Sequence, residues 1–126
     1  MTASKKQILI VDDEPTWIKL LSHLLRTQGY GVLEATNAKD ALKTLASTKP
    51  DLILSDVRIP DMNGFDFLVQ VKRTAKNSKT PIVFVSAIDD YDARKVAKDL
   101  GATDYLIKPF EEQEVLSLLS KYLGPR

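Results

Sequence analysis

The sequence predicts an α/β fold, an open and doubly wound sandwich in which one parallel sheet has helices on both faces. Short β-branched or aliphatic runs alternate with longer segments of helical apolar spacing, in five units of about 25 residues each. The length of 126 residues allows one compact domain. Because crossovers between parallel strands are right-handed, the topology is limited to an open, doubly wound sheet or a closed barrel. Five strands are too few for the eight-stranded barrel. The strand runs are residues 8–11, 31–35, 52–54, 82–85 and 104–107.

Helix signals fill the segments between these runs. Pro15 stands where the first residue of a helix would lie, because that position needs no N–H and suits the φ of proline. The helix that it begins is expected to run to Gln28. Later segments repeat apolar residues at i, i+3, i+4 and i+7, the spacing of one buried face. The expected N-caps are Asn37 with Asp40 and Asp89 with Asp92, and the glycines expected just after helix ends are Gly29 and Gly101.

The composition excludes several classes of function. Lys and Arg number 18 against 17 Asp and Glu, and this net charge of +1 argues against direct nucleic-acid binding, which favours a basic excess. The absence of Cys excludes disulfides, thiolate metal sites and cysteine nucleophiles. Apolar runs reach only about five residues, against roughly 20 for a membrane span, and residues 1–7 lack a signal-peptide core. We expect a soluble, cytoplasmic protein without membrane contact.

Polar side chains follow four of the five strand runs. Asp12 and Asp13 end the first run, Asp56 follows the third, Ser86 the fourth and Lys108 the fifth. Any single one of these acids is readily explained as the N-cap of the next helix. Together they would meet at one edge, because ligands in such sheets bind outside the carboxyl ends of the strands. The second strand contributes no such group, as expected of an edge strand.

The chemistry of this cluster is restrictive. Three crowded carboxylates repel one another, so they must take up protons or bind a cation. Oxygen ligands without His or Cys suit a hard ion such as Mg²⁺. One carboxylate could also act as a nucleophile that forms an aspartyl phosphate, and a nearby ammonium and hydroxyl could hold the phosphoryl oxygens.

Four segments, in order and spacing, resemble the receiver domain of two-component response regulators. The resemblance covers roughly residues 6–122 and so implies a single receiver domain over residues 1–126. It also implies the flavodoxin-like strand order 2-1-3-4-5. The segments are ILIVDDEP at 8–15, DLILSDVRIPDMNG at 51–64, IVFVSA at 82–87 and GATDYLIKPF at 101–110.

The resemblance assigns a role to each residue at the sheet edge. Asp56 would accept a phosphoryl group from a phosphohistidine on a sensor histidine kinase or a histidine phosphotransfer protein. Asp13 and Asp56 would bind Mg²⁺ directly. Asp12 would help through a water molecule, and the backbone carbonyl of Arg58 would supply a further ligand. Lys108 would contact the phosphoryl group.

The resemblance also implies a conformational switch. Ser86 would move its hydroxyl toward the phosphoryl group, Tyr105 would change rotamer with it, and the Lys108–Pro109 peptide bond would be cis. The chain would then be a signalling phosphoacceptor and not an enzyme, assisting only its own phosphotransfer and autodephosphorylation. The sequence ends soon after the last helical segment, so no output domain is expected in it, and its downstream target stays open.

Three alternative functions fit less well. A flavodoxin-like mononucleotide binder needs a Ser/Thr/Gly-rich loop after the first strand, whereas residues 12–15 read DDEP. A phosphohydrolase that resembles the haloacid dehalogenases carries Asp-x-Asp, whereas Arg58 stands where the second acid after Asp56 belongs. The third alternative is a pseudo-receiver that binds partners without phosphorylation. The presence of every residue that the chemistry needs argues against it.

The first helix has apolar residues over about 160° of its circumference, wider than the stripe of about 100° that one buried face requires. The leucines at its centre are expected in the core. Ile18 and Leu20, with Trp17, are expected at the surface that receives the kinase. His23 lies on the polar side of this helix and is expected to be a solvated surface residue.

Two further side chains bear on how long a phosphorylated state survives. In the family, the residues two positions beyond the acceptor and the switch hydroxyl flank the path of the hydrolytic water, and here these are Arg58 and Ile88. Neither is an amide or carboxylate that would orient this water. Slow autodephosphorylation is therefore expected.

Overall fold

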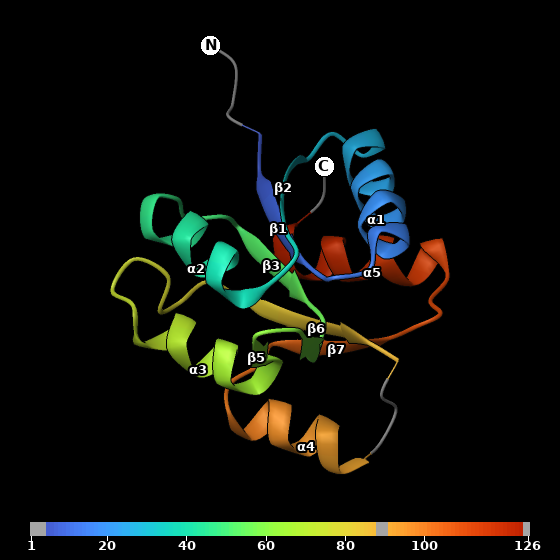
Figure 1. Ribbon diagram of the computed structural model, residues 1–126. Coiled ribbons are helices and arrows are strands. Elements are labelled where there is room, and N and C mark those ends of the chain that lie inside the picture. Colours follow the sequence, from blue (N-terminus) through green and yellow to red (C-terminus); the bar gives the residue numbers. More distant parts are fainter. Residues whose placement is uncertain (1–4, 88–90, 125–126) are drawn as a thin grey trace.

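The computed structural model describes residues 5–87 and 91–124, which fold around a five-stranded parallel sheet (Figure 1). Neighbouring strands follow the order β2-β1-β3-β6-β7, which confirms the predicted order 2-1-3-4-5 when the strands of this sheet are counted along the chain. β2 lies at an edge, as its lack of a polar end group indicates. The strands are β1 (Gln7–Val11), β2 (Gly31–Ala35), β3 (Leu52–Ser55), β6 (Ile82–Ser86) and β7 (Asp104–Ile107).

Helices cover both faces of this sheet, as predicted. In Figure 1, α1 and α5 lie on one face, and α2, α3 and α4 lie on the other. The hydrophobic core is divided in the same way, because the buried residues form one cluster beneath α1 and α5 and another beneath the remaining helices. The helices are α1 (Pro15–Thr27), α2 (Ala38–Ser47), α3 (Gly64–Arg73), α4 (Tyr91–Asp99) and α5 (Glu112–Leu123).

Strand β1 contributes side chains to both core clusters. Ile8 and Ile10 pack in the cluster beneath α1 and α5, whereas Leu9 and Val11 pack in the cluster on the opposite face. Successive side chains of a strand point to opposite faces, so a strand covered on both sides must be apolar throughout. This explains the unbroken apolar runs from which the strands were predicted.

The helix ends follow the sequence signals. The side chain of Asn37 accepts a hydrogen bond from the Asp40 N–H, 2.7 Å away, and so caps α2 as predicted. Gly29 and Gly101 follow α1 and α4 with φ of 92° and 103°, a left-handed conformation that glycine adopts without strain. The other predicted cap, Asp89, lies outside the described residues.

A short antiparallel hairpin between β3 and α3 was not predicted. It consists of β4 (Arg58–Ile59) and β5 (Met62–Asn63), and two-residue strands are too short for a hydrophobic period to indicate them. Gly64 closes the hairpin. Its N–H donates to the Val57 carbonyl at 2.8 Å, and an added Cβ would lie 2.7 Å from the Asp56 carbonyl oxygen. No side chain fits there, so the backbone at Gly64 packs directly against the backbone of the residues that follow β3.

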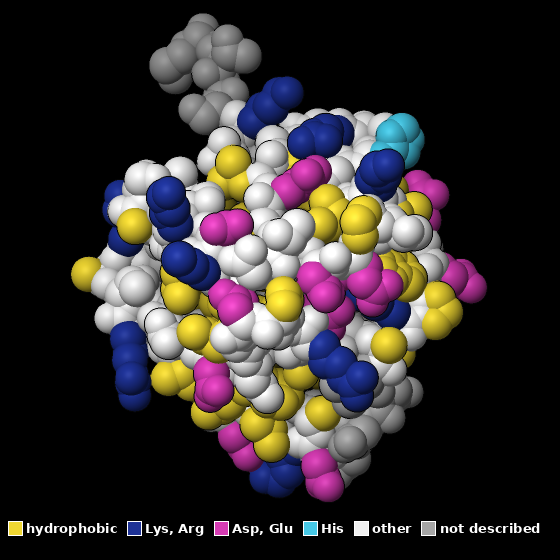
Figure 2. All heavy atoms as spheres, in the orientation of Figure 1, with side chains coloured by type: hydrophobic (Ala, Val, Ile, Leu, Met, Phe, Trp, Pro, Cys, Tyr) yellow, Lys and Arg dark blue, Asp and Glu magenta, His cyan; other side chains and the backbone are white. Residues whose placement is uncertain are grey.

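The surface carries both signs of charge. On the face shown in Figure 2, Lys and Arg side chains lie interspersed with Asp and Glu. His23 is exposed, as predicted. Among the helices of the described ranges, none has the length and apolar character needed to cross a bilayer.

Candidate functional site

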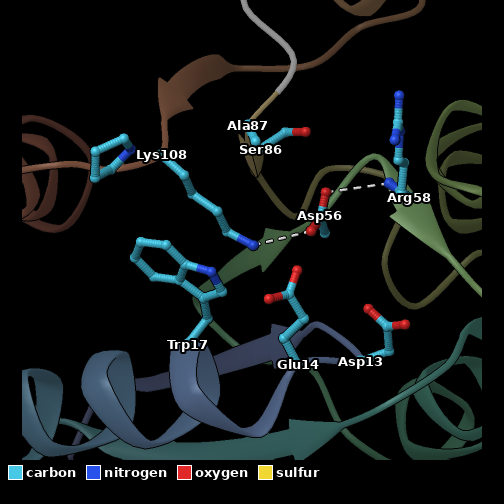
Figure 3. A pocket seen from close by; sticks show the side chains of 9 residues that line it. Asp13, Glu14, Trp17, Asp56, Arg58, Ser86, Ala87 and Lys108 are labelled. Atoms are coloured by element: carbon cyan, nitrogen blue, oxygen red, sulfur yellow. Dashed lines mark hydrogen bonds and ion pairs between the residues drawn. The ribbon is translucent and has the colours of Figure 1, made fainter.

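The carboxyl ends of β1, β3, β6 and β7 meet at an open cavity of about 710 Å³ (Figure 3). Its walls carry Asp56 from the end of β3, Ser86 from the end of β6 and Lys108 from just after β7. These three predicted residues therefore lie together at the carboxyl edge of the sheet, as expected. The lining residues are Asp13, Glu14, Trp17, Asp56, Arg58, Ser86, Ala87, Lys108 and Pro109.

Lys108 links the ends of three strands. Its Nζ donates to Asp12 Oδ2 at 2.6 Å and to Asp56 Oδ2 at 2.9 Å, and all three side chains are buried. Burial opposes the charged form of Lys108, but the hydrogen bonds to the two carboxylates outweigh it and raise the pKa of the ammonium. The lysine is therefore a fixed positive charge between two carboxylates.

Burial has the opposite consequence for the neighbouring acid. It raises the pKa of the Asp12 carboxyl, and the hydrogen bonds from Lys108 and from the Glu14 N–H compensate only in part. This is the expected response of a carboxylate that has lost water. It also means that a cation brought near Asp12 would stabilise its ionised form.

Asp56 is held at both carboxylate oxygens. Oδ1 accepts a hydrogen bond from the Arg58 N–H at 3.1 Å, while Oδ2 accepts the one from Lys108. The Asp56 main chain is fixed as well, because its N–H donates to the Val11 carbonyl at 2.9 Å. The carboxylate thus reaches the cavity in one defined orientation, with a cation on one side and a backbone donor on the other.

Three carboxylates gather beside Lys108. Asp12, Glu14 and Asp56 each place an oxygen within 4.8 Å of the others, and Figure 3 shows the Glu14 carboxylate turned toward Asp56. This donor set contains only oxygen and carries excess negative charge, so it fits a hard divalent cation. The predicted ligands Asp12 and Asp56 are therefore brought together.

Glu14 was not predicted as a site residue, because only Asp12 and Asp13 were considered at the end of the first strand run. It is the N-cap residue of α1, and this position aims its side chain at the cavity. Asp13 lines the same cavity but does not belong to the group of three carboxylates found among the described residues. The run of three acids after β1 is the signal that could have identified Glu14.

The two predicted switch residues lie in different places. Ser86 is buried and lines the cavity. Tyr105 is absent from the described lining of that cavity and is half-buried, with its ring 6.2 Å from that of Phe84 and 5.7 Å from the Arg94 guanidinium. The Lys108–Pro109 peptide bond is cis, as expected.

The apolar surface of α1 differs from the prediction at one residue. Leu20 is 49% exposed, and Trp17 lines the cavity, as expected. Ile18 is only 7% exposed, so the prediction that it faces solvent is wrong. The reason is that α5 packs beside α1, and Ile18 joins the core cluster that includes Val115 and Leu119. Two neighbours, the sheet and α5, bury a wider arc of the helix than one would.

Comparison with known proteins identifies the family. The family model described as response regulator receiver domain matches residues 8–120. The chain belongs to this family. The receiver domain is 36% identical to the protein PilH of Pseudomonas aeruginosa over 118 residues, which cover 94% of this chain and 98% of that protein.

Solved receiver structures show the same fold. The chemotaxis response regulator CheY4 of Vibrio cholerae superposes with a TM-score of 0.89 at 31% identity, covering 94% of this chain and 99% of CheY4. The receiver domain of the sensor histidine kinase PA1611 of Pseudomonas aeruginosa, at 26% identity, has a TM-score of 0.88 and covers 97% of this chain and all of that one. That structure has a magnesium ion coordinated in its active-site cleft. The chain is thus a receiver domain of the two-component type, and receiver domains of such systems interact with histidine kinases.

Proposed function

We propose that Asp56 accepts a phosphoryl group from a phosphohistidine of a sensor histidine kinase or a histidine phosphotransfer protein. The observation that carries this proposal is the contact of one buried ammonium, that of Lys108, with Asp56 and Asp12 at 2.9 and 2.6 Å. A nucleophilic carboxylate needs a nearby positive charge to receive a phosphoryl group, which is itself negative. Lys108 supplies that charge without leaving the site.

The reaction follows from this arrangement. An oxygen of the Asp56 carboxylate forms the new O–P bond as the N–P bond to the imidazole breaks, and the electron pair of that bond remains on the ring nitrogen. The Arg58 N–H and Lys108 hold the carboxylate in place. Lys108 can then turn one of its N–H groups to a phosphoryl oxygen. The Ser86 hydroxyl, in the wall of the same cavity, would approach another.

The receiver domain is proposed to use Mg²⁺ as its cofactor. Asp12 and Asp56 belong to both the predicted ligand set and the observed carboxylate group, and Glu14 extends it. Asp13 and the backbone carbonyl of Arg58 complete the set that the family implies. When bound, the ion supplies positive charge that offsets the repulsion between these carboxylates and the incoming phosphoryl oxygens. The magnesium ion in the PA1611 receiver domain supports this choice.

Phosphorylation is proposed to act on other proteins through a change in conformation. Ser86 would move toward the phosphoryl group. Tyr105, which is on β7 and lies next to Arg94 of α4, would change rotamer with it. The phosphoryl group would later be lost by autodephosphorylation. We propose residues 1–126 as one receiver domain whose output target is still to be identified.

Labelling by acetyl phosphate with Mg²⁺ tests the proposal directly. The Asp56→Asn variant should take up no phosphoryl group, and a chelator of Mg²⁺ should abolish labelling of the wild-type chain. Asp51→Asn is the matched control, because Asp51 precedes β3 and binds the Gln7 N–H at the other end of the strand. Its labelling should equal that of the wild type. Undiminished labelling of Asp56→Asn would show that another residue is the acceptor.

A further inference from the structure

The tip of the β4–β5 hairpin contacts the beginning of helix α2 (Figure 1). Asp61, in the turn of this hairpin, accepts two backbone hydrogen bonds there. Its Oδ1 receives the Ala38 N–H at 2.8 Å, and its Oδ2 receives the Lys39 N–H at 2.9 Å. Asp61 is thus bound at both oxygens to a segment more than 20 residues away in the sequence.

These two bonds do not merely duplicate the cap that α2 already has. The local cap, Asn37, receives the Asp40 N–H, whereas Asp61 receives those of the two preceding residues. The first N–H groups of a helix have no partner inside the helix, and its N-terminus attracts negative charge. These same bonds lower the pKa of the exposed Asp61 carboxyl. The ionised Asp61 carboxylate therefore ties the hairpin tip to the N-terminus of α2 through both of its oxygens.

The other end of this hairpin carries part of the phosphorylation site. Arg58, the first residue of β4, donates its N–H to Asp56 Oδ1, and its backbone pairs with Asn63 across the hairpin. At the base, the Gly64 N–H binds the Val57 carbonyl, where no side chain can enter. The segment is therefore fixed at its base by Gly64 and at its tip by Asp61, with Arg58 between them.

We propose that Asp61 is a positioning residue for the phosphorylation site, which anchors the hairpin to α2 and thereby holds the Arg58 backbone beside Asp56 and the cation. This inference rests on the proposed function, because it concerns the same Asp56 and the same cation site. Partners that orient metal ligands commonly change metal affinity by tenfold or more when they are removed. Loss of Asp61 should therefore weaken Mg²⁺ binding, although Asp61 touches neither the ion nor the phosphoryl group.

The two caps of α2 provide a matched pair of variants. Asp61→Ala and Asn37→Ala each remove a side-chain acceptor from the same helix end, so both should lower the midpoint of thermal unfolding. Only Asp61→Ala frees the hairpin. We expect it to weaken Mg²⁺ binding roughly tenfold in a calorimetric titration, whereas Asn37→Ala should bind Mg²⁺ as the wild type does. Asp61→Asn keeps one acceptor oxygen and should recover part of the affinity.

Labelling by acetyl phosphate gives a second measurement. The rate for Asp61→Ala should fall at low Mg²⁺ and return close to the wild-type rate at saturating Mg²⁺, because only the affinity for the ion has changed. Unchanged Mg²⁺ affinity in Asp61→Ala and Asp61→Asn would overturn the inference. So would equal weakening by Asn37→Ala, which would trace the effect to α2 alone. A wild-type chain that neither binds Mg²⁺ nor becomes labelled would instead refute the proposed function.

Discussion

The ammonium of Lys108 lies 4.9 Å from the centre of the Trp17 ring. The same ring packs at 5.3 Å against Phe110, two residues after Lys108. A cation over an aromatic face is attracted by the ring, so Trp17 helps to hold the lysine where it meets Asp12 and Asp56. The first turn of α1 therefore contributes an aromatic side chain to the wall of the cavity, next to the lysine.

Trp17 should report on events at this site, because it is the only Trp of the chain and its ring lies beside Lys108. Binding of Mg²⁺ or of a phosphoryl analogue changes the charge around this lysine, and the fluorescence of Trp17 should change with it. The titration should saturate with added Mg²⁺ and should be lost in Asp13→Ala. A spectrum that does not respond to saturating Mg²⁺ would place the ion away from the indole.

The Lys108→Met variant should be less stable than the wild type. Removal of the ammonium leaves the Asp12 and Asp56 carboxylates buried without their shared donor, and breaking a buried ion pair in this way costs about 3 kcal/mol of unfolding free energy. Urea unfolding at neutral pH measures this loss. Adding Asp12→Asn to Lys108→Met should restore part of the lost stability, because one of the two mutually repelling carboxylates is then neutral. Equal stability of Lys108→Met and the wild type would contradict this account of the site.

Much of the fold and site could be predicted because strand runs and strand ends are local signals. Residues Asp12, Asp56, Ser86 and Lys108 each follow an apolar run, and a parallel sheet must gather such positions at one edge. What could not be predicted depends on contacts between distant segments. The contact between Asp61 and α2 is one example, because no local pattern indicates that a hairpin tip will meet a helix N-terminus.

The two local errors have physical causes of the same kind. Ile18 was expected at the surface because its position on the helix was compared with only one buried face, and α5 provides a second. Glu14 was overlooked because only the two acids directly after the first strand run were considered, whereas Glu14 meets Asp12 and Asp56 only once α1 packs against the sheet. Position along the helix sets the direction of a side chain, but its neighbours decide whether it is buried.

The stability contributed by Asp61 should depend on pH. Hydrogen bonds from the Ala38 and Lys39 N–H groups lower its pKa below the ordinary value of 3.8. A lowered pKa in the folded state means that the stabilisation is complete above the unfolded pKa and is lost as the pH falls through the folded one. The difference in thermal midpoint between the wild type and Asp61→Ala should therefore be constant from pH 7 to about pH 5 and shrink below pH 3.8.

Asn37→Ala is the control for this titration. Asn37 caps the same helix with an amide oxygen, which does not titrate, and only its longer bond to the Asp40 carboxylate depends on charge. Most of the difference between Asn37→Ala and the wild type should therefore persist to low pH. If the Asp61→Ala difference also persisted unchanged into the acid range, the bonds to α2 would not depend on the charge of Asp61.

Leu20 should contribute to docking of the phosphodonor. It is an exposed apolar side chain on α1, the helix whose first turn lines the site. Leu20→Ser should slow transfer from a histidine phosphotransfer protein about fivefold, equivalent to about 1 kcal/mol of lost apolar contact. Labelling by acetyl phosphate should not change. Val96→Ser is the control, because Val96 is similarly exposed but lies on α4. Equal losses with both donors would indicate misfolding.

The lifetime of the phosphorylated state should be long, because neither Arg58 nor Ile88 can orient a water for hydrolysis. Hydrolysis needs a water in line with the bond between Asp56 and phosphorus, on the side away from the carboxylate. Arg58 is exposed and lines the cavity, and Figure 3 shows its backbone N beside Asp56 and its side chain extended away from that carboxylate, long enough to turn toward a bound phosphoryl group. A guanidinium pairs with phosphoryl oxygens and cannot accept a proton from water. Ile88, the other residue of this pair, lies outside the described residues and has no hydrogen-bonding group.

Replacing both side chains by groups that orient water should therefore shorten this lifetime. The Arg58→Asn/Ile88→Glu variant should lose its phosphoryl group roughly tenfold faster, equivalent to about 1.4 kcal/mol in the barrier. Release of phosphate from the labelled chain after removal of the donor measures the rate. Arg58→Lys is the control, because lysine keeps the positive charge without providing an amide or carboxylate. An equal or slower rate in the double variant would show that the residues shared by the family, Lys108 and the carboxylates around it, set the lifetime alone.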